Sequence, residues 1–332
     1  MLLRTLSTAA YAVGVAALLS GCSQSASSPL VAQSQPQSLT QNGVLGARPT
    51  SGAAVRTPGW LSPEAKSGKG LLYVSDQFNQ RIAIFSTKKS SSPEPVGQIT
   101  DGISAPDGAF VDPKGTLYVC NFGAGTVTEY AKGKTKLSKT LTGAGSPKYV
   151  VAGTDGTVYV SNFNGSFNGD VLEYAKGKKT PTQTIPFSTF PAGLALDKSN
   201  NLYVAYNDSQ QGDIEVLEFA PGSTNGTNLG IHIAFGYAGS MTIDKKGELL
   251  IADQEDAIVY VFPSGATKPS TTYSTTAAYA VALDAANKHL FISAPFAPAV
   301  SEITYPKGVP VQTYSNTLSA AFGVATSPDS AL

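Results

Sequence analysis

One short apolar unit, close to Tyr-Val-Ser-Asp in sequence, recurs six times along the chain. The copies begin at Leu72, Leu117, Val158, Leu202, Leu249 and Leu290. From the second residue of each copy to that of the next (73, 118, 159, 203, 250 and 291), the steps are 45, 41, 44, 47 and 41 residues. A period in the forties with strand-like content is typical of an array of small sheets, most often a β-propeller.

Each repeat contains four predicted strands. An apolar strand such as 109–112 or 194–197 comes first, a tight turn such as 113–115 follows, and the Tyr-Val strand is second. A third strand (for example 171–174) and a weaker fourth strand (for example 183–185) complete the unit. Alternating β-branched and aromatic residues are typical of half-buried strands. Each repeat therefore predicts one four-stranded propeller blade.

The two ends of the array predict how the ring closes. The first copy begins at a second strand, through residues 70–72, whereas residues 322–329 have the pattern of a first strand and its turn. The C-terminal strand is expected to pair into the first blade, which would remove the free sheet edges. The predicted fold is all-β, a six-bladed β-propeller of four-stranded blades over residues 59–332.

From about residue 70 to the end, the repeated Tyr-Val-Ser-Asp strands resemble those of the NHL-repeat and SMP-30-like six-bladed propellers. The resemblance implies architecture, since this fold hosts both enzymes and binding proteins. SMP-30-like lactonases hold a divalent cation with a Glu/Asn/Asp set at the openings of the inner strands. At those openings here, only Asp107 offers a plausible oxygen ligand, and the neighbouring Lys148 would repel a cation.

The N-terminal segment predicts membrane attachment. Residues 1–21 are interpreted as a lipoprotein signal peptide, with Arg4 as its positive charge and an uncharged stretch over 5–19. Leu19-Ser20-Gly21-Cys22 resembles the lipobox of bacterial lipoproteins, which implies cleavage before Cys22 and acylation of that cysteine. Several acyl chains on one residue give stable anchoring. An ordinary cleaved signal and an uncleaved anchor are the alternatives.

Residues 22–58 are predicted to be the lipidated cysteine and a disordered tether rich in Ser, Gln and Pro. The expected location is the bacterial cell envelope, lipid-anchored and extracytoplasmic, at the outer membrane or the cell surface. Ser23 follows the cysteine in place of Asp, which in the Gram-negative lipoproteins that this segment resembles implies an outer-membrane address.

Composition excludes several function classes. The 23 basic and 23 acidic residues balance to a net charge of zero, which argues against a nucleic-acid partner. After Cys22 only Cys120 remains, so an intramolecular disulfide is excluded, and Cys120 is expected to be a small buried residue. Motifs for nucleophilic, phosphate-binding or zinc chemistry are absent, and His232 and His289 have no partner at metal-ligand spacing.

Four aspartates, at positions 112, 197, 244 and 284, each stand at the start of a predicted hairpin turn. At such a position a carboxylate accepts hydrogen bonds from backbone N–H groups. We therefore expect these residues to be structural.

Charged residues are predicted to divide between two faces of the ring. The acidic face consists of the loops that join second to third strands and of those that join consecutive blades. It carries Asp76, Asp107, Asp170, Asp208, Asp213, Asp253, Glu255 and Asp256. The basic face consists of the remaining turns, with most of the lysines. The tether is expected to enter from the basic face and to turn it toward an anionic membrane; the alternative is that lysine is simply common in exposed turns.

The acidic face is also rich in aromatic residues and is the predicted ligand-binding face. Its candidate residues are Asp76, Asp107, Asn121, Phe122, Lys148, Tyr149, Asn162, Phe163, Phe167, Tyr206, Asp208, Tyr237 and Asp253. Aromatic rings beside carboxylates can stack a sugar or hold a peptide. The alternative is that several of these rings pack between blades.

The predicted function is a non-enzymatic binding module for a glycan, a peptide or a protein, with no catalytic residue assigned and no cofactor predicted. One alternative is a metal-dependent, lactonase-like hydrolase or lyase at the channel mouth, with a divalent cation such as Ca²⁺ near Asp107. A structural envelope protein is the other.

Overall fold

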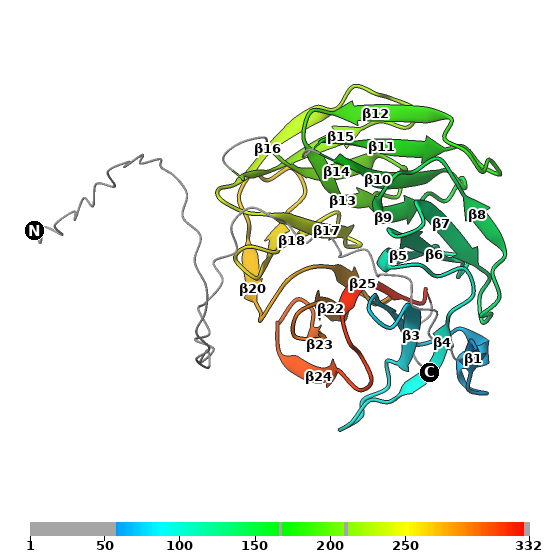
Figure 1. Ribbon diagram of the computed structural model, residues 1–332. Helices are drawn as coiled ribbons and strands as arrows, with labels where there is room; N and C mark the ends of the chain where they lie inside the picture. Colours follow the sequence, from blue (N-terminus) through cyan, green and yellow to red (C-terminus); the bar gives the residue numbers. More distant parts are fainter. Residues whose placement is uncertain (1–57, 166–167, 209–211, 329–332) are drawn as a thin grey trace, which may run out of the picture. The chain divides into compact units, whose positions relative to one another are not determined.

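The repeated strands form six antiparallel sheets in the computed structural model, which describes residues 58–165, 168–208 and 212–328. The sheets are arranged as blades around a central axis (Figure 1). The predicted signal peptide, Cys22, the tether up to residue 57 and Phe167 lie outside the described residues. Within the described part, no helix has the length and the apolar character needed to cross a bilayer.

Every blade has four strands in order from the axis outward, and the first blade has a fifth. Blade 1 consists of β25 (Ala321–Thr326), β2 (Leu71–Asp76), β3 (Arg81–Ser86), β4 (Pro95–Ile99) and β1 (Trp60–Leu61). Blade 2 consists of β5 (Pro106–Val111), β6 (Leu117–Asn121), β7 (Thr126–Tyr130) and β8 (Lys139–Leu141). Blade 3 consists of β9 (Pro147–Ala152), β10 (Val158–Gly165), β11 (Asn168–Tyr174) and β12 (Gln183–Phe187).

The second half of the chain repeats the same order. Blade 4 consists of β13 (Phe190–Leu196), β14 (Leu202–Asn207), β15 (Ile214–Phe219) and β16 (Thr227–Ile233). Blade 5 consists of β17 (Ala238–Ile243), β18 (Leu249–Asp253), β19 (Ile258–Phe262) and β20 (Thr271–Ser274). Blade 6 consists of β21 (Val281–Leu283), β22 (His289–Ala294), β23 (Ala299–Thr304) and β24 (Pro310–Tyr314).

The predicted ring closure is confirmed. β25 pairs antiparallel with β2, with Leu72 opposite Thr326 and Val74 opposite Val324, so the last strand is the innermost strand of the first blade. The Ser327 hydroxyl oxygen also accepts a hydrogen bond from the N–H of Leu71 at 3.0 Å. The ring is thus joined by backbone hydrogen bonds between residues more than 240 positions apart, and the inner edge of β2 is covered.

The prediction that the chain joins the ring directly at the second strand, from the basic face, is wrong. β1 adds to the outer edge of blade 1 and runs antiparallel to β4, with Trp60 opposite Gln98. Because β4 runs toward the acidic face, Pro58 lies at the acidic-face end of the blade, where its carbonyl accepts a hydrogen bond from the Gln98 side chain. Two residues are too few to show a period, so the pattern gave no signal for β1.

The motif residues that define the repeat form the blade cores. Val74, Val119, Val160 and Val204 are fully buried, as are Leu250 and Phe291. Cys120 is buried as well, and burial raises the pKa of its thiol well above its usual value. Its expected role as a small buried residue is therefore confirmed, and the neutral thiol is a poor nucleophile.

The turn aspartates are also structural, as expected. One carboxylate oxygen of Asp112 accepts hydrogen bonds from the backbone N–H groups of Lys114 and Thr116, at 2.9 and 2.8 Å. The same oxygen of Asp197, Asp244 and Asp284 accepts two backbone N–H groups in the equivalent turn. These carboxylates therefore stabilise the turns between first and second strands.

Candidate functional site

Close approach of the inner strands narrows the central channel toward the acidic face. Glycines stand where neighbouring blades touch: a Cβ at Gly193 would lie 2.8 Å from the carbonyl oxygen of Gly239. A Cβ at Gly323 would collide with the carbonyl oxygen of Asp107, and one at Gly239 with that of Tyr279. Only glycine fits at such contacts, so these residues permit the constriction.

A polar cluster crosses the channel at this constriction. The Tyr149 hydroxyl on blade 3 donates a hydrogen bond to the carbonyl oxygen of Tyr279, just before blade 6, at 3.2 Å. Blades 3 and 6 lie opposite each other in a ring of six. Asp107 on blade 2 accepts the Tyr279 hydroxyl at 2.7 Å and forms an ion pair with Lys148 at 2.7 Å. The channel is therefore blocked at its acidic-face end.

Burial determines the chemistry of this cross-channel cluster, defined by Asp107, Lys148, Tyr149 and Tyr279. Asp107 is 1% exposed and the two tyrosines are 4% exposed. Burial, with the nearby charge of Asp107 as the second cause, raises the pKa of both tyrosines well above the usual value, so both stay neutral. The Lys148 ammonium also lies 5.5 Å from the centre of the Phe122 ring and 5.3 Å from that of Tyr279.

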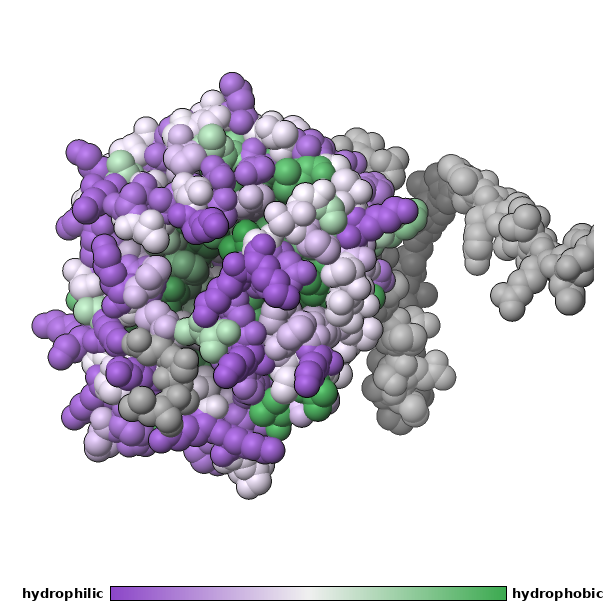
Figure 2. All heavy atoms as spheres, turned by 180° about the vertical axis from the view of Figure 1, so that it is seen from behind, coloured by the Kyte–Doolittle hydropathy of each residue, from purple (hydrophilic) through white to green (hydrophobic). Residues whose placement is uncertain are grey.

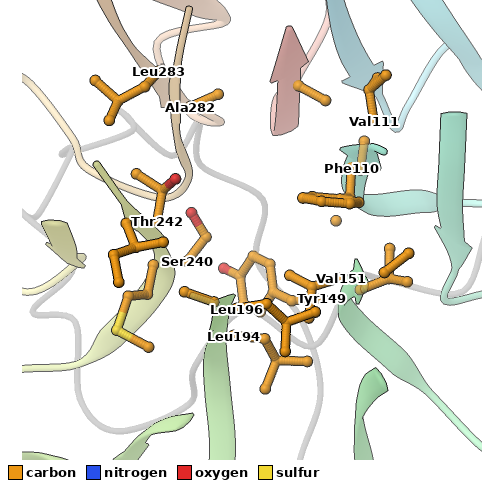
Figure 3. Close-up of a pocket in the computed structure, with 18 of the residues that line it drawn as sticks. Phe110, Val111, Tyr149, Val151, Leu194, Leu196, Ser240, Thr242, Ala282 and Leu283 are labelled. Atoms are coloured by element: carbon orange, nitrogen blue, oxygen red, sulfur yellow. The ribbon is translucent and has the colours of Figure 1, made fainter. Parts of the chain in front are cut away.

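Beyond the blockage, toward the basic face, the channel widens into an apolar cup of 360 Å³. Inner-strand residues of all six blades form its wall, among them Phe110, Val151, Leu196, Thr242 and Leu283. In Figure 3 the labelled residues, which come from blades 2 to 6, surround a common space, with Tyr149 and Ser240 beside it. The volume lies within the range of ligand pockets in proteins, roughly 300–1,000 Å³.

The rim of the cup consists of the turns between first and second strands. Pro113, Thr154, Lys198 and Asn200 belong to both the rim and the lining. Hydrogen bonds between adjacent blades connect these turns: the Thr154 N–H donates to the Asn200 side chain at 3.1 Å. Figure 2 shows a face of the molecule with hydrophobic residues in a central hollow and hydrophilic side chains around it.

Four predicted ligand-binding residues at the ends of second strands are buried and already hydrogen-bonded. The Asp76 carboxylate accepts the N–H groups of Ser319 and Ala320 and pairs with Arg81 at 2.9 Å. The side-chain oxygens of Asn121, Asn162 and Asp253 likewise accept backbone N–H groups of the loops that join consecutive blades. The last motif residue thus holds the inter-blade loop, which explains why Asp or Asn recurs there.

Some of the predicted aromatic side chains pack against neighbouring residues, and others are partly exposed. Phe163 packs edge-on against Phe190, and the Tyr206 hydroxyl donates to Glu215 at 2.6 Å. Tyr237 is half-buried, and burial raises the pKa of its hydroxyl. Asp208 is half-buried at the end of β14. The rings that the acidic face displays openly are others: Phe78, Phe235 and Phe296, at 58%, 74% and 66% exposure.

The arrangement at the acidic-face mouth differs from an oxygen-rich cation site. Among the described residues, Asp107 is the only carboxylate at the inner-strand openings, and the Lys148 ammonium lies 2.7 Å from it. Across the described residues, no group of three or more His, Cys, Asp or Glu side chains has the arrangement of a metal site. Lys148 therefore occupies the position beside Asp107 that a bound cation would need.

Sequence reasoning did not identify the cup. Its lining residues were recognised only as apolar first strands, because hydrophobic pattern does not distinguish a residue that faces the channel from one that packs against the next blade. The available signal was residue size. At the second position before the turn, blades 4, 6 and 1 carry Ala195, Ala282 and Ala325, where blade 2 carries Phe110.

Together the fold and site define a six-bladed β-propeller with a channel closed at one end. Residues 65–164, about the first two blades and part of the third, match the model of the SMP-30/Gluconolactonase/LRE-like region. The resemblance expected from the repeats is thus confirmed at the level of family model and fold. A comparison with curated proteins gave no match.

Solved structures agree on the fold. A protein of unknown function from Desulfotomaculum acetoxidans is 18% identical, with a TM-score of 0.56, over 79% of this chain and 100% of that one. The nidogen/laminin complex contains a chain that is 15% identical, with a TM-score of 0.62, over 78% and 98%. Kuenenia stuttgartiensis hydrazine synthase is 15% identical, with a TM-score of 0.59, over 81% and 89%. At these identities the likeness concerns the fold alone.

Proposed function

We propose that this protein is a lipoprotein of the bacterial cell envelope whose propeller acts as a non-enzymatic binding module, with its ligand in the apolar cup. The observation that carries the proposal is a 360 Å³ cup with a mainly apolar wall, open on the basic face and blocked at the other end by the cross-channel cluster. Apolar surface that is withdrawn from water in such a cup supplies binding free energy in proportion to its area.

A neutral hydrophobic fluorophore, N-phenyl-1-naphthylamine, tests the cup. The wild-type protein should bind one molecule with enhanced emission, and Ala282→Trp should abolish this binding because the indole fills the cup. Ala297→Trp places the same side chain on an exposed residue of the acidic face and should leave binding unchanged.

Thr242→Phe provides a second filled cup if Ala282→Trp does not fold, and the urea unfolding midpoint of each variant shows which proteins are folded. Equal binding by wild type and folded filled-cup variants, or no binding by the wild type, would contradict the proposal.

Membrane attachment through Cys22 is part of the proposal and is supported by the lipobox-like sequence 19–22. Cys22→Ser should leave the protein out of the detergent phase in Triton X-114 partitioning and prevent incorporation of radiolabelled palmitate. Partitioning of Cys22→Ser with the membrane, like the wild type, would show that another element anchors the chain.

A second candidate site for a glycan, peptide or protein is the acidic face, and the exposed rings of Phe78, Phe235 and Phe296 favour it. Exposed aromatic side chains are enriched at binding surfaces. The triple change of these residues to Ser should weaken pull-down of a glycan or protein partner without changing fluorophore binding in the cup. If the triple variant still binds both the partner and the fluorophore as the wild type does, the acidic face is not the binding site.

Residues 65–164 match the SMP-30/Gluconolactonase/LRE-like region, and this match favours a lactonase-like activity as the alternative function. Its test is hydrolysis of gluconolactone with and without 1 mM Ca²⁺, with Asp107→Asn as the variant. Calcium-dependent turnover that Asp107→Asn abolishes would establish this alternative in place of the non-enzymatic module.

A further inference from the structure

Around the open end of the cup, most basic side chains are exposed to solvent, whereas most acidic side chains are buried or half-buried. Exposed lysines occupy the turns of this face throughout: Lys66, Lys69, Lys88, Lys89, Lys114, Lys134, Lys136, Lys176, Lys178, Lys179, Lys198, Lys245, Lys246, Lys268, Lys288 and Lys307. The exposed acidic residues of the same turns are Glu64, Glu94 and Asp155.

The other carboxylates of this face are directed into the protein. Asp112 and Asp244 are buried, and Asp197 and Asp284 are half-buried. Each accepts two backbone N–H groups within its own turn, as described above, and the second oxygen of Asp244 accepts the Tyr305 hydroxyl at 3.1 Å. Glu248 pairs with Lys246 at 3.6 Å. Hydrogen bonds thus hold the turn aspartates against the turn backbone, whereas the lysine side chains named above are exposed to solvent.

Five of the exposed lysines stand in the turns that form the rim: Lys114, Lys198, Lys245, Lys246 and Lys288. Lys198 lines the cup directly, as does Asp197, whose carboxylate accepts two backbone N–H groups of its own turn. Lys114 follows Pro113, which also lines the cup. Lys245 and Lys288 occupy the turns between first and second strands of blades 5 and 6. A molecule seated in the cup would therefore have its apolar part against Phe110, Leu196 and Leu283 and its outer end among ammonium groups.

We propose that the ligand of the cup is an amphipathic anion, with a hydrocarbon chain inside the cup and a carboxylate at the lysine rim. This inference rests on the cup as binding site and adds the chemical class of its ligand. Electrostatic complementarity fixes the orientation: the polar end cannot be seated at the closed end, where the Lys148 ammonium is already paired with Asp107.

Decanoate and decanol have the same chain length and differ in the charge of the head group. Comparing them separates the contribution of the apolar cup from that of the lysine rim. Both should displace N-phenyl-1-naphthylamine, and decanoate should bind more tightly, by a margin that decreases as salt is raised from 50 to 500 mM. Equal affinity of the two compounds would overturn the inference and leave the cup as a site for neutral ligands.

The rim is tested with Lys114→Gln, Lys198→Gln and Lys288→Gln combined. Removal of three nearby charges should weaken the binding of decanoate by roughly five- to tenfold, since each exposed charge pair contributes modestly. The affinity for decanol should stay unchanged. Lys136→Gln, Lys178→Gln and Lys268→Gln combined remove the same charge from turns between third and fourth strands and should change decanoate affinity by less than about twofold. Equal losses in the two triple variants would show that the overall field, and not the rim, attracts the anion.

Two further outcomes distinguish failure of the cup as the binding site from failure of the amphipathic anion as its ligand. Unchanged binding of both compounds by a folded Ala282→Trp variant would show that neither occupies the cup, which contradicts the proposed function itself. If decanoate does not bind, but vesicles of phosphatidylglycerol bind wild type and Ala282→Trp equally, the basic face is a membrane-docking surface and the inference is wrong.

Discussion

Gly323 shows how a single residue type shapes the channel. It lies in β25, and a Cβ there would meet backbone atoms of the neighbouring inner strand, among them the N–H of Ala109 at 2.8 Å. Backbone atoms of strands that are each hydrogen-bonded within their own blade cannot move aside as a flexible side chain could. The residue therefore permits the ring to close tightly at the level of the cross-channel cluster.

Gly323→Ala should lower the free energy of unfolding by roughly 1–3 kcal/mol, the usual cost of overpacking a close contact. Gly145→Ala is the matched control, because its nearest neighbour would lie 3.8 Å away, at an ordinary contact distance. Urea denaturation followed by circular dichroism measures both. Equal stability of the two variants would show that the inner strands can separate at no cost.

At the scale of elements, β25 pairs with a strand at the opposite end of the described chain, β2. It covers the inner edge of β2 and also lies beside β5, where Gly323 approaches Asp107. Without it, blade 1 would expose a row of unpaired backbone groups beside the channel, and the cup would lose Val324 and Thr326 from its wall.

Truncation before Ala321 should therefore prevent cooperative folding or produce aggregates, as measured by size-exclusion chromatography and thermal unfolding. Truncation after Pro328 retains β25 and the Ser327 hydroxyl that binds the Leu71 N–H, and it should behave as the full chain does. A monomeric, cooperatively unfolding product of the shorter truncation would contradict the role of β25 in ring closure.

At the scale of the whole molecule, tyrosines are buried throughout the ring and stay neutral in the folded state. Burial raises the pKa of Tyr73 in blade 1 to about 12, and burial is likewise the main cause that raises the pKa of Tyr130 in blade 2 to about 12. In the unfolded chain both would ionise near pH 10. The folded state therefore binds more protons than the unfolded state between these values.

The free energy of unfolding should accordingly be insensitive to these groups below pH 10 and should fall as pH rises from about 10 through about 12. The loss is of the order of 2–3 kcal/mol per tyrosine, because one pKa unit corresponds to about 1.4 kcal/mol. Urea unfolding at a series of pH values measures it, and Tyr73→Phe should make the decline shallower. A stability that is constant up to pH 12 would contradict this account.

The sequence alone determined the blades, their number and the way the ring closes. Period, alternation and turn chemistry are local properties, and six copies make each of them visible, down to the turn aspartates that bind backbone N–H groups. The candidate site could be predicted only in part. Asp107 and Lys148 were recognised as neighbours at the inner-strand openings, and their ion pair agrees with that expectation.

The tertiary structure decided which end of the channel is open. Tyr149 and Tyr279, 130 positions apart, meet across the axis, and glycines on separate strands let the blades approach there. No local pattern encodes such a contact, because it depends on how six similar units are placed around one axis. The short β1 gave no signal in the sequence, because a two-residue strand shows no period. The small residues of the cup can be read in the sequence, but they face a common space only once the ring is closed.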